Sequence, residues 1–189
     1  MIINIRGTSG SGKTTLMRKF FEMCDSKEAI VPVGAKKPKG YKCSYRGKTV
    51  FVVGSYENAC GGCDTISTQD EIQQLVDDFS FDGNVIFEGL FISHIYGRYA
   101  EMAKANPSNF VFFMLETEFD TCIEHIKKRR EEAGNFEELK DSVYRNARRT
   151  YDSTYRIREK LTRDNLQWEE LPLKGRFTLF EDLLDFYLE

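Results

Sequence analysis

Short apolar runs separated by amphipathic stretches recur along this 189-residue chain. The runs at 2–6, 85–87 and 110–115 have the length and the β-branched or aromatic content of buried strands. Residues 41–45 and 49–54 predict a β-hairpin, and 166–171 predict a last strand. Apolar residues at helical spacing predict helices at 13–23, 69–79, 94–104, 119–130, 137–161 and 178–187, with Ser67 or Thr68 capping the second. The alternation of strands and helices favours a parallel sheet that is covered on both faces.

Composition and charge narrow the class of protein. The net charge is −3, but basic residues gather at 36–48, 127–130 and 145–149. No stretch approaches the roughly 18 apolar residues that span a bilayer, and the start lacks the features of a signal peptide. We therefore expect no membrane contact and a cytoplasmic location, in the host cytoplasm if a phage encodes the chain. The odd number of cysteines, five, favours free thiols, and Cys60 with Cys63 would form only half of a zinc site.

Residues 7–14, Gly-Thr-Ser-Gly-Ser-Gly-Lys-Thr, match the phosphate-loop pattern G-x-x-x-x-G-K-[ST] at every position, between a predicted strand and a predicted helix. The glycines permit a tight loop whose N–H groups point at phosphate oxygens. We expect Lys13 to bridge the β- and γ-phosphates of ATP and Thr14 to coordinate Mg²⁺. The predicted nucleotide-binding residues are Gly7, Ser9, Gly10, Ser11, Gly12, Lys13, Thr14 and Thr15, joined by Arg129 and Arg130.

Two further features favour a kinase. Glu88 follows the strand at 85–87, where a carboxylate can hold Mg²⁺ or orient the acceptor, although a strand-end acid can also simply face solvent. A basic helix end, a break and a second arginine-rich helix resemble the lid of small-molecule P-loop kinases, at about 128–150. Lid arginines neutralise the charge that develops during transfer, and we assign Arg129 and Arg148 to this role. The alternative is that these arginines lie on a solvated helix face.

A guanine-reading Asn-Lys-x-Asp motif is absent from the sequence, which argues against a GTPase.

The segment 54–66 occupies the position that faces the acceptor in P-loop kinases. It holds acids and no arginine, which favours a hydroxyl acceptor over a phosphate. Asp64 is our first candidate for the group that takes the proton, and Glu57 the second. Tyr56 could stack on a base or sugar. Structural alternatives remain for both principal residues, since Asp64 could cap a helix and Tyr56 could pack in the core.

Several segments together resemble one group of bacteriophage P-loop kinases, the 5-hydroxymethyluracil DNA kinases. They are residues 1–15, 36–41, Gly54-x-Tyr56-Glu57, Gly61-Gly62-x-Asp64-Thr65-Ile66 and Phe87-Glu88-Gly89-Leu90. The expected fold is an α/β P-loop NTPase three-layer sandwich, with a five-stranded mainly parallel sheet, a small β-hairpin insertion and an Arg-rich helical lid. We expect a single domain over residues 1–189.

The resemblance implies ATP-dependent phosphorylation of the hydroxymethyl group of a modified pyrimidine in DNA. A DNA partner would suit the basic hairpin, including Lys37, as a contact for the phosphate backbone, and the target base would have to leave the stack. The isoelectric point of about 5.6 is low for a DNA-binding protein, and these lysines could instead be a solvated sheet edge. Two other functions remain open: a nucleoside or nucleotide kinase with a free substrate, and a non-catalytic ATP-binding switch.

Overall fold

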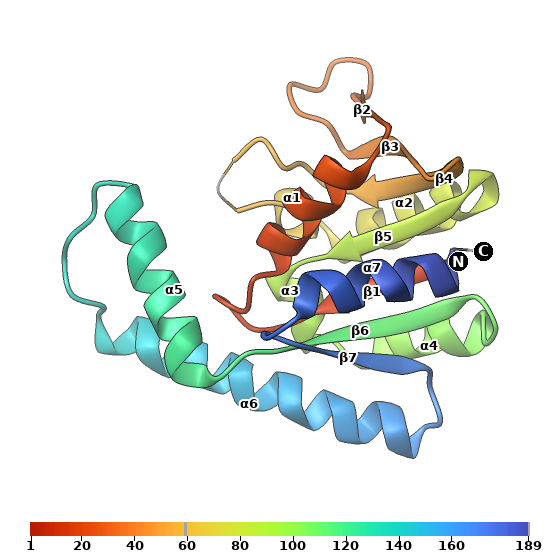
Figure 1. Ribbon diagram of the computed structural model, residues 1–189. Helices are drawn as coiled ribbons and strands as arrows, with labels where there is room; N and C mark the ends of the chain where they lie inside the picture. Colours follow the sequence, from red (N-terminus) through yellow and green to blue (C-terminus); the bar gives the residue numbers. More distant parts are fainter. Residues whose placement is uncertain (59, 189) are drawn as a thin grey trace.

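The computed structural model describes residues 1–58 and 60–188, and a seven-stranded mixed sheet lies at its centre (Figure 1). The strand order is β2-β3-β4-β5-β1-β6-β7. The strands are β1 (Ile2–Arg6), β2 (Ser26–Ile30), β3 (Gly40–Tyr45), β4 (Lys48–Val53), β5 (Asn84–Glu88), β6 (Phe110–Glu116) and β7 (Trp168–Pro172). The helices are α1 (Lys13–Met23), α2 (Gln69–Asp82), α3 (Leu90–His94), α4 (Gly97–Ala105), α5 (Phe119–Glu132), α6 (Asp141–Arg163) and α7 (Arg176–Tyr187), with a 3₁₀ turn η1 (Cys63–Thr65).

The sheet corrects our expectation of five strands. Five neighbouring strands, β4-β5-β1-β6-β7, are parallel, and β2 and β3 extend them as antiparallel strands. The predicted hairpin exists as β3 and β4, joined through Arg46 and Gly47 at φ 50° and 77°. It is not a small insertion, however, because β4 pairs with β5 within the central sheet.

β2 was missed by the sequence analysis for a physical reason. It pairs only with β3 at the sheet edge, and four of its five residues are exposed. Its sequence, Ser-Lys-Glu-Ala-Ile, therefore has no alternation of apolar and polar residues from which a strand could be predicted.

Helices cover both faces of the sheet (Figure 1). On one face, Phe20 of α1 and Phe180 of α7 pack with Ile3 and Ile5 of β1 in one buried cluster. On the other face, a second cluster includes Ile72 of α2 and Tyr99 of α4, with contributions from α3 and α6. No helix within the described residues combines the length and the apolar character needed to cross a membrane.

Two helix predictions need adjustment. The helix predicted at 94–104 corresponds to α4, which begins only at Gly97, because Ile95 is extended and His94 ends a separate short helix, α3. The neighbouring Tyr96 is held by α6, since its hydroxyl donates hydrogen bonds to the Asp164 carboxylate and the Lys160 carbonyl group. The helix predicted to begin at 137 begins at Asp141, because Lys140 is still extended. The cap of α2 is Thr68, which accepts a hydrogen bond from the backbone of Glu71.

α5, the connection at 133–140 and the first half of α6 form an arm that projects from the carboxyl ends of the parallel strands (Figure 1). β1 and β5 deliver the glycine-rich loop and Glu88 to the same edge of the sheet. Ligands bind at this edge in open α/β sheets, so the candidate site lies between the sheet and the arm.

Candidate active site

The glycine-rich loop at residues 7–14 joins β1 to α1. Gly10 and Gly12 have φ angles of 79° and 96°, which residues with side chains rarely adopt. A Cβ atom at Gly10 would also lie 2.2 Å from the carbonyl oxygen of Cys122 in α5. The two glycines thus let the loop turn sharply and let α5 cross close above it.

Lys13 lies at the centre of this loop and is buried. Its Nζ atom donates hydrogen bonds to the carbonyl oxygens of Gly7 at 2.8 Å and Thr8 at 3.1 Å. Burial lowers the pKa of the ammonium group, and the nearby Glu88 and Asp64 carboxylates oppose that shift. The loop therefore holds a preplaced positive charge where phosphate oxygens would bind.

Two side chains that the sequence analysis missed hold the loop from outside. Arg176, at the start of α7, donates hydrogen bonds to the Ser11 carbonyl oxygen at 2.6 Å and to the Thr117 hydroxyl at 2.8 Å. His125 of α5 places Nδ1 2.8 Å from the carbonyl oxygen of Gly10. Neither residue has a local sequence signal, because each acts on a loop more than a hundred positions away.

Glu88 ends β5 beside the loop, with 1% of its surface exposed. The Thr14 hydroxyl donates a hydrogen bond to its Oε1 atom at 3.4 Å. Burial raises the pKa of the Glu88 carboxyl group to about 7, although the Lys13 ammonium opposes that shift. Thr14 and Glu88 thus offer two oxygen ligands of the kind that Mg²⁺ prefers. The described residues contain no cluster of three or more His, Cys, Asp or Glu side chains that could hold a metal.

The Gly61-Gly62 turn packs directly against Glu88. Gly62 has φ 72°, and a Cβ atom there would lie 2.5 Å from the Glu88 carbonyl oxygen and 2.7 Å from its Oε1 atom. A Cβ atom at Gly61 would lie 2.7 Å from the ring of Tyr56. Only glycines can therefore bring this segment so close to the carboxylate.

Asp64 follows the glycine turn and is exposed at the edge of the site. Its Oδ2 atom accepts a hydrogen bond from the Leu90 N–H group at 2.8 Å, and Oδ1 accepts one from the Phe91 N–H group at 3.1 Å. Asp64 thus accepts hydrogen bonds from the first N–H groups of α3. It therefore has a helix-capping role, which was the structural alternative for this residue. These bonds also fix its carboxylate beside the loop, and both oxygens keep further acceptor capacity.

The other residues predicted to contact the substrate lie differently. Tyr56 is buried, with its ring against Phe21 at 5.2 Å, so it offers no free face to a base. Its hydroxyl approaches Glu88 without forming a hydrogen bond to a described residue. Glu57 and Lys37 are both exposed in loops.

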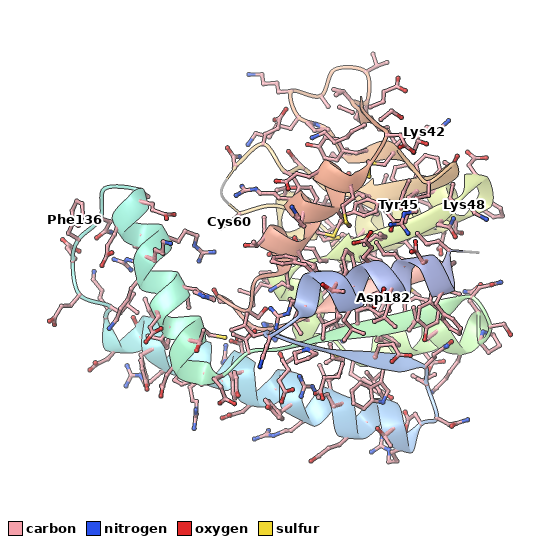
Figure 2. All side chains as sticks on the ribbon, in the orientation of Figure 1. Lys42, Tyr45, Lys48, Cys60, Phe136 and Asp182 are labelled. Atoms are coloured by element: carbon pink, nitrogen blue, oxygen red, sulfur yellow. The ribbon has the colours of Figure 1, made fainter. Side chains whose placement is uncertain are left out.

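The basic hairpin lies apart from the site. Lys42 and Lys48 are at the sheet end of the molecule, far from Phe136 at the tip of the arm (Figure 2). Part of the hairpin's charge is already paired, since Arg46 contacts Glu181 and Asp185. Lys39 forms an ion pair with Glu71 at 3.0 Å.

The predicted lid arginines separate into two groups. Arg129 lines the cavity above the loop, and Arg130 lines a neighbouring cavity. Arg148 instead lies over the ring of Phe119 at 4.6 Å and pairs with Asp152 at 3.7 Å, and it lines neither cavity.

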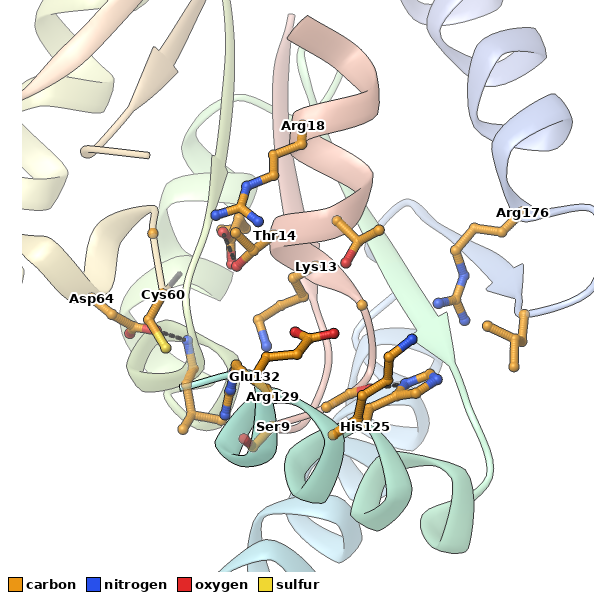
Figure 3. Close-up of a pocket in the computed structure, with 18 of the residues that line it drawn as sticks. Ser9, Lys13, Thr14, Arg18, Cys60, Asp64, His125, Arg129, Glu132 and Arg176 are labelled. Carbon is orange, nitrogen blue, oxygen red and sulfur yellow. Dashed lines mark hydrogen bonds between the residues drawn. The ribbon is translucent and has the colours of Figure 1, made fainter. Parts of the chain in front are cut away.

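A cavity of about 470 Å³ joins these parts (Figure 3). Its floor is the glycine-rich loop, including Ser9 and residues 12–15. Asp64 lies on one side of the cavity and Arg176 on the other (Figure 3), and Glu88 and Phe177 also line it. Arg129 of α5 faces the loop, whereas His125 of α5 contacts the loop directly (Figure 3).

Arg18 and Lys128 also line this cavity. Arg18 was missed, but it follows Thr14 by four positions on α1 and so belongs to the same helix face, which the sequence could have revealed. It donates a hydrogen bond to the Asn58 carbonyl oxygen at 2.9 Å. Lys128 belongs to the basic run noted in the sequence.

The phosphate-binding loop lies at the edge of a mostly parallel sheet, and it faces two acidic residues, Asp64 and Glu88, and the basic arm. These features define the class of proteins that bind nucleotide phosphates. No protein-family model matches the chain. It is 39% identical over 131 residues to a 5-hmdU DNA kinase of Pseudomonas phage PaMx11, covering 68% of this chain and 69% of that protein. It is 32% identical over 137 residues to a 5-hmdU DNA kinase of Pseudomonas phage M6, covering 67% and 71%.

A more distant relative, a 5-hmdU DNA kinase of Delftia phage PhiW-14, is 28% identical over 154 residues, covering 73% of this chain and 56% of that protein. The chain belongs to the family of phage 5-hmdU DNA kinases. It is accordingly a phosphotransferase that uses a nucleotide phosphate donor.

Proposed function

We propose that this protein transfers the γ-phosphoryl group of ATP to the hydroxymethyl group of 5-hydroxymethyluracil in DNA. The observation that supports this proposal most strongly is that Lys13, Glu88 and Asp64 all line one cavity. The relatives of the chain are phage proteins named 5-hmdU DNA kinases. The parallel sheet with its first loop at the nucleotide edge is consistent with a P-loop kinase-like fold.

The residues at the loop fit ATP and Mg²⁺. The loop N–H groups and Lys13 would hold the phosphate chain, and the exposed side chains of Leu173 and Phe177 offer an apolar end for the nucleotide base. Thr14 and Glu88 would hold Mg²⁺, which neutralises charge on the phosphate oxygens when it is bound.

The transfer needs a place for the acceptor's proton. The hydroxymethyl oxygen forms a bond to the γ-phosphorus while the bond from that phosphorus to the leaving ADP oxygen breaks. Asp64 is placed to take the proton, because its carboxylate is exposed to the cavity and oriented by two backbone N–H groups. Glu57 is exposed and does not line the cavity, although Cys60 and Gly61 of the same segment do, so we assign the proton to Asp64.

Charge on the transferred group needs a cation from the arm. Arg129 faces the loop across the cavity, and we assign it to this role, with Arg130 beside it. Arg148 would first have to leave Phe119 and Asp152, so in this arrangement we assign it to packing α6 against α5.

The test offers γ-labelled ATP and Mg²⁺ with four acceptors: duplex DNA containing 5-hydroxymethyluracil, the same duplex with thymine, the free nucleoside and the free mononucleotide. We expect label to enter only the hydroxymethyl DNA. Label in the free compounds alone would make the protein a metabolite kinase, and ATP hydrolysis with no labelled acceptor would make it an ATP-binding switch.

Lys13→Ala is the control for that assay. Removing the ammonium group from the loop should abolish transfer to every acceptor while circular dichroism shows an unchanged fold. Normal turnover by Lys13→Ala would refute the assignment of the phosphate loop as the catalytic centre.

A further inference from the structure

A second cavity, of about 390 Å³, lies between α5, α6 and the start of α3. It shares Ser9, Leu90 and Arg129 with the cavity above the phosphate loop, so the two are contiguous. Its volume falls within the roughly 300–1,000 Å³ that is usual for small-molecule sites. Arg129 and Arg130 line this space, but neither the nucleotide nor the acceptor has been placed in it.

The walls of the second cavity carry apolar side chains from three different helices. They are Leu90, Ile126, Val143 and Ala147, and the remaining lining residues are polar or charged. Apolar surfaces of this kind can sandwich a flat ring. The cavity therefore offers apolar surface on which an aromatic heterocycle can pack.

A few polar groups converge on the same space. The Asn146 side chain lines the cavity and forms no hydrogen bond within the described part of the chain. Arg130 also lines it, and its Nε atom is buried with no hydrogen-bond partner among those residues. The Asn146 amide is exposed in the cavity and Arg130 lines the same space, so donors and an acceptor are available there for the edge of a ligand.

A base that has left the DNA stack needs a cavity that packs against its ring and binds its edge. Tyr56, the aromatic residue expected to receive it, is buried against Phe21 and closed off by Gly61. The second cavity instead opens toward Ser9 and Arg129, where the phosphoryl group would be transferred. Arg145 and Arg149, exposed on α6 beside the cavity, form no ion pair with a described residue and could contact a DNA backbone.

We propose that the second cavity receives the pyrimidine base of the acceptor after it has left the DNA duplex, and that Asn146 and Arg130 read its edge. This inference rests on the proposed function. Uracil presents an N3–H donor flanked by two carbonyl acceptors. The Asn146 amide can accept from N3–H and donate to a carbonyl oxygen, and a guanidinium N–H group of Arg130, which lines the same cavity, can donate to the other. The hydroxymethyl group, carried by the neighbouring C5 atom, would then point toward the phosphoryl group.

The experiment measures kcat and KM for duplex DNA containing either 5-hydroxymethyluracil or 5-hydroxymethylcytosine, together with the KM for ATP. Asn146→Ala should lower kcat/KM for the uracil DNA by roughly 5- to 150-fold, the usual range for loss of a two-bond base contact. The KM for ATP should not change, because Asn146 does not line the cavity above the loop.

Asn146→Asp gives a signature that a structural role would not produce. A carboxylate cannot donate to a uracil carbonyl but can accept from the exocyclic amine of cytosine. The ratio of activity on 5-hydroxymethylcytosine DNA to that on the uracil DNA should therefore rise by at least about tenfold. Glu159→Ala is the matched control, since Glu159 is exposed on the same helix about 20 Å farther along.

A steric variant gives a second route to the same answer. Val143→Trp would fill the cavity and should block DNA phosphorylation while leaving ATP binding intact. Its control is Tyr144→Trp at the adjacent position, which is 46% exposed and lines neither cavity.

The two levels of the proposal fail in different ways. If the wild-type protein phosphorylates no hydroxymethyluracil DNA, the proposed function is wrong and the inference falls with it. If the wild-type protein is active but Asn146→Ala, Asn146→Asp and Val143→Trp all keep its kcat/KM and base preference within about twofold, the function stands and the cavity assignment is overturned.

Discussion

Glu88 shows how one buried side chain couples this site to pH. Its pKa is raised to about 7 from the ordinary value of 4.5, mainly by burial. The folded protein therefore binds this proton more tightly than the unfolded chain does. The resulting stabilisation is complete below about pH 4.5 and is lost as the pH rises through about 7.

Glu88→Gln should consequently remove part of the pH dependence of stability in Mg²⁺-free buffer. Between about pH 5 and 8, the wild-type free energy of unfolding should fall relative to that of Glu88→Gln by on the order of 1–3 kcal/mol. Denaturant unfolding at several pH values measures the difference. Glu57→Gln, at an exposed acid, should keep the wild-type profile, and a Glu88→Gln profile parallel to wild type would contradict the assigned pKa shift.

Asp64 can be tested for its two roles separately. Asp64→Asn keeps one acceptor oxygen for α3 and so should lose about 1 kcal/mol of stability. If Asp64 accepts the proton, however, Asp64→Asn should also lower kcat by on the order of 10²-fold or more. Steady-state kinetics beside thermal unfolding distinguishes the roles: a rate loss of only a few-fold would leave Asp64 as an anchor of α3 alone.

Among the connecting elements, the Gly61-Gly62 turn has the least freedom to change. It brings the segment between β4 and α2 into contact with Glu88, and a Cβ atom at Gly62 would collide with both the backbone and the carboxylate of that residue. The turn therefore couples the acceptor side of the site to the residue proposed to hold the metal.

Gly62→Ala should destabilise the protein by more than the roughly 1–2 kcal/mol that a positive φ angle alone costs an alanine, and it should sharply reduce phosphoryl transfer. Gly47→Ala is the matched control, because Gly47 has a similar φ of 77° but open space around its Cβ position. Denaturant unfolding compares the two. Equal losses of stability would show that the contact with Glu88 is unimportant.

The elements differ in how far the sequence could predict them. The phosphate loop and Glu88 were recognisable because each follows an apolar strand directly. β2 was not, because an exposed edge strand carries no apolar face. The break between α3 and α4 and the clamp by Arg176 depend on partners far along the chain, which local patterns do not encode. The burial of Tyr56 likewise follows from packing against Phe21 of α1.

At the scale of the whole molecule, a net charge of −3 conceals an uneven surface. Two basic regions lie apart. One is residues 36–48, which include Lys42 and Lys48 at the sheet end of the molecule (Figure 2), and the other is the α5–α6 arm, which carries Arg145 and Arg149. Only the arm adjoins the two cavities. A DNA duplex that presents a base to the site would therefore lie along the arm.

Charge reversal can locate the DNA path. Arg145→Glu with Arg149→Glu should raise the KM for polymeric DNA by about tenfold or more. The slope of log KM against log salt concentration should also decrease by about two, which is the loss expected for two phosphate contacts. Lys36→Glu with Lys37→Glu should have a much smaller effect, although our sequence analysis assigned Lys37 to the substrate. Kinetics across a series of salt concentrations measures both; the opposite ranking would move the DNA path to the hairpin.

The contact between Arg176 and Ser11 has a consequence for how the protein is made. Ser11 leaves the ribosome early, whereas Arg176 follows it by 165 positions. A nascent chain that has already emerged past β6 can pair its central strands, but its phosphate loop still lacks the guanidinium group that holds the Ser11 and Thr117 oxygens. The part of the site that is translated first is thus completed only when Arg176 has been added, so the growing polypeptide should gain tight nucleotide affinity only after α7 has emerged.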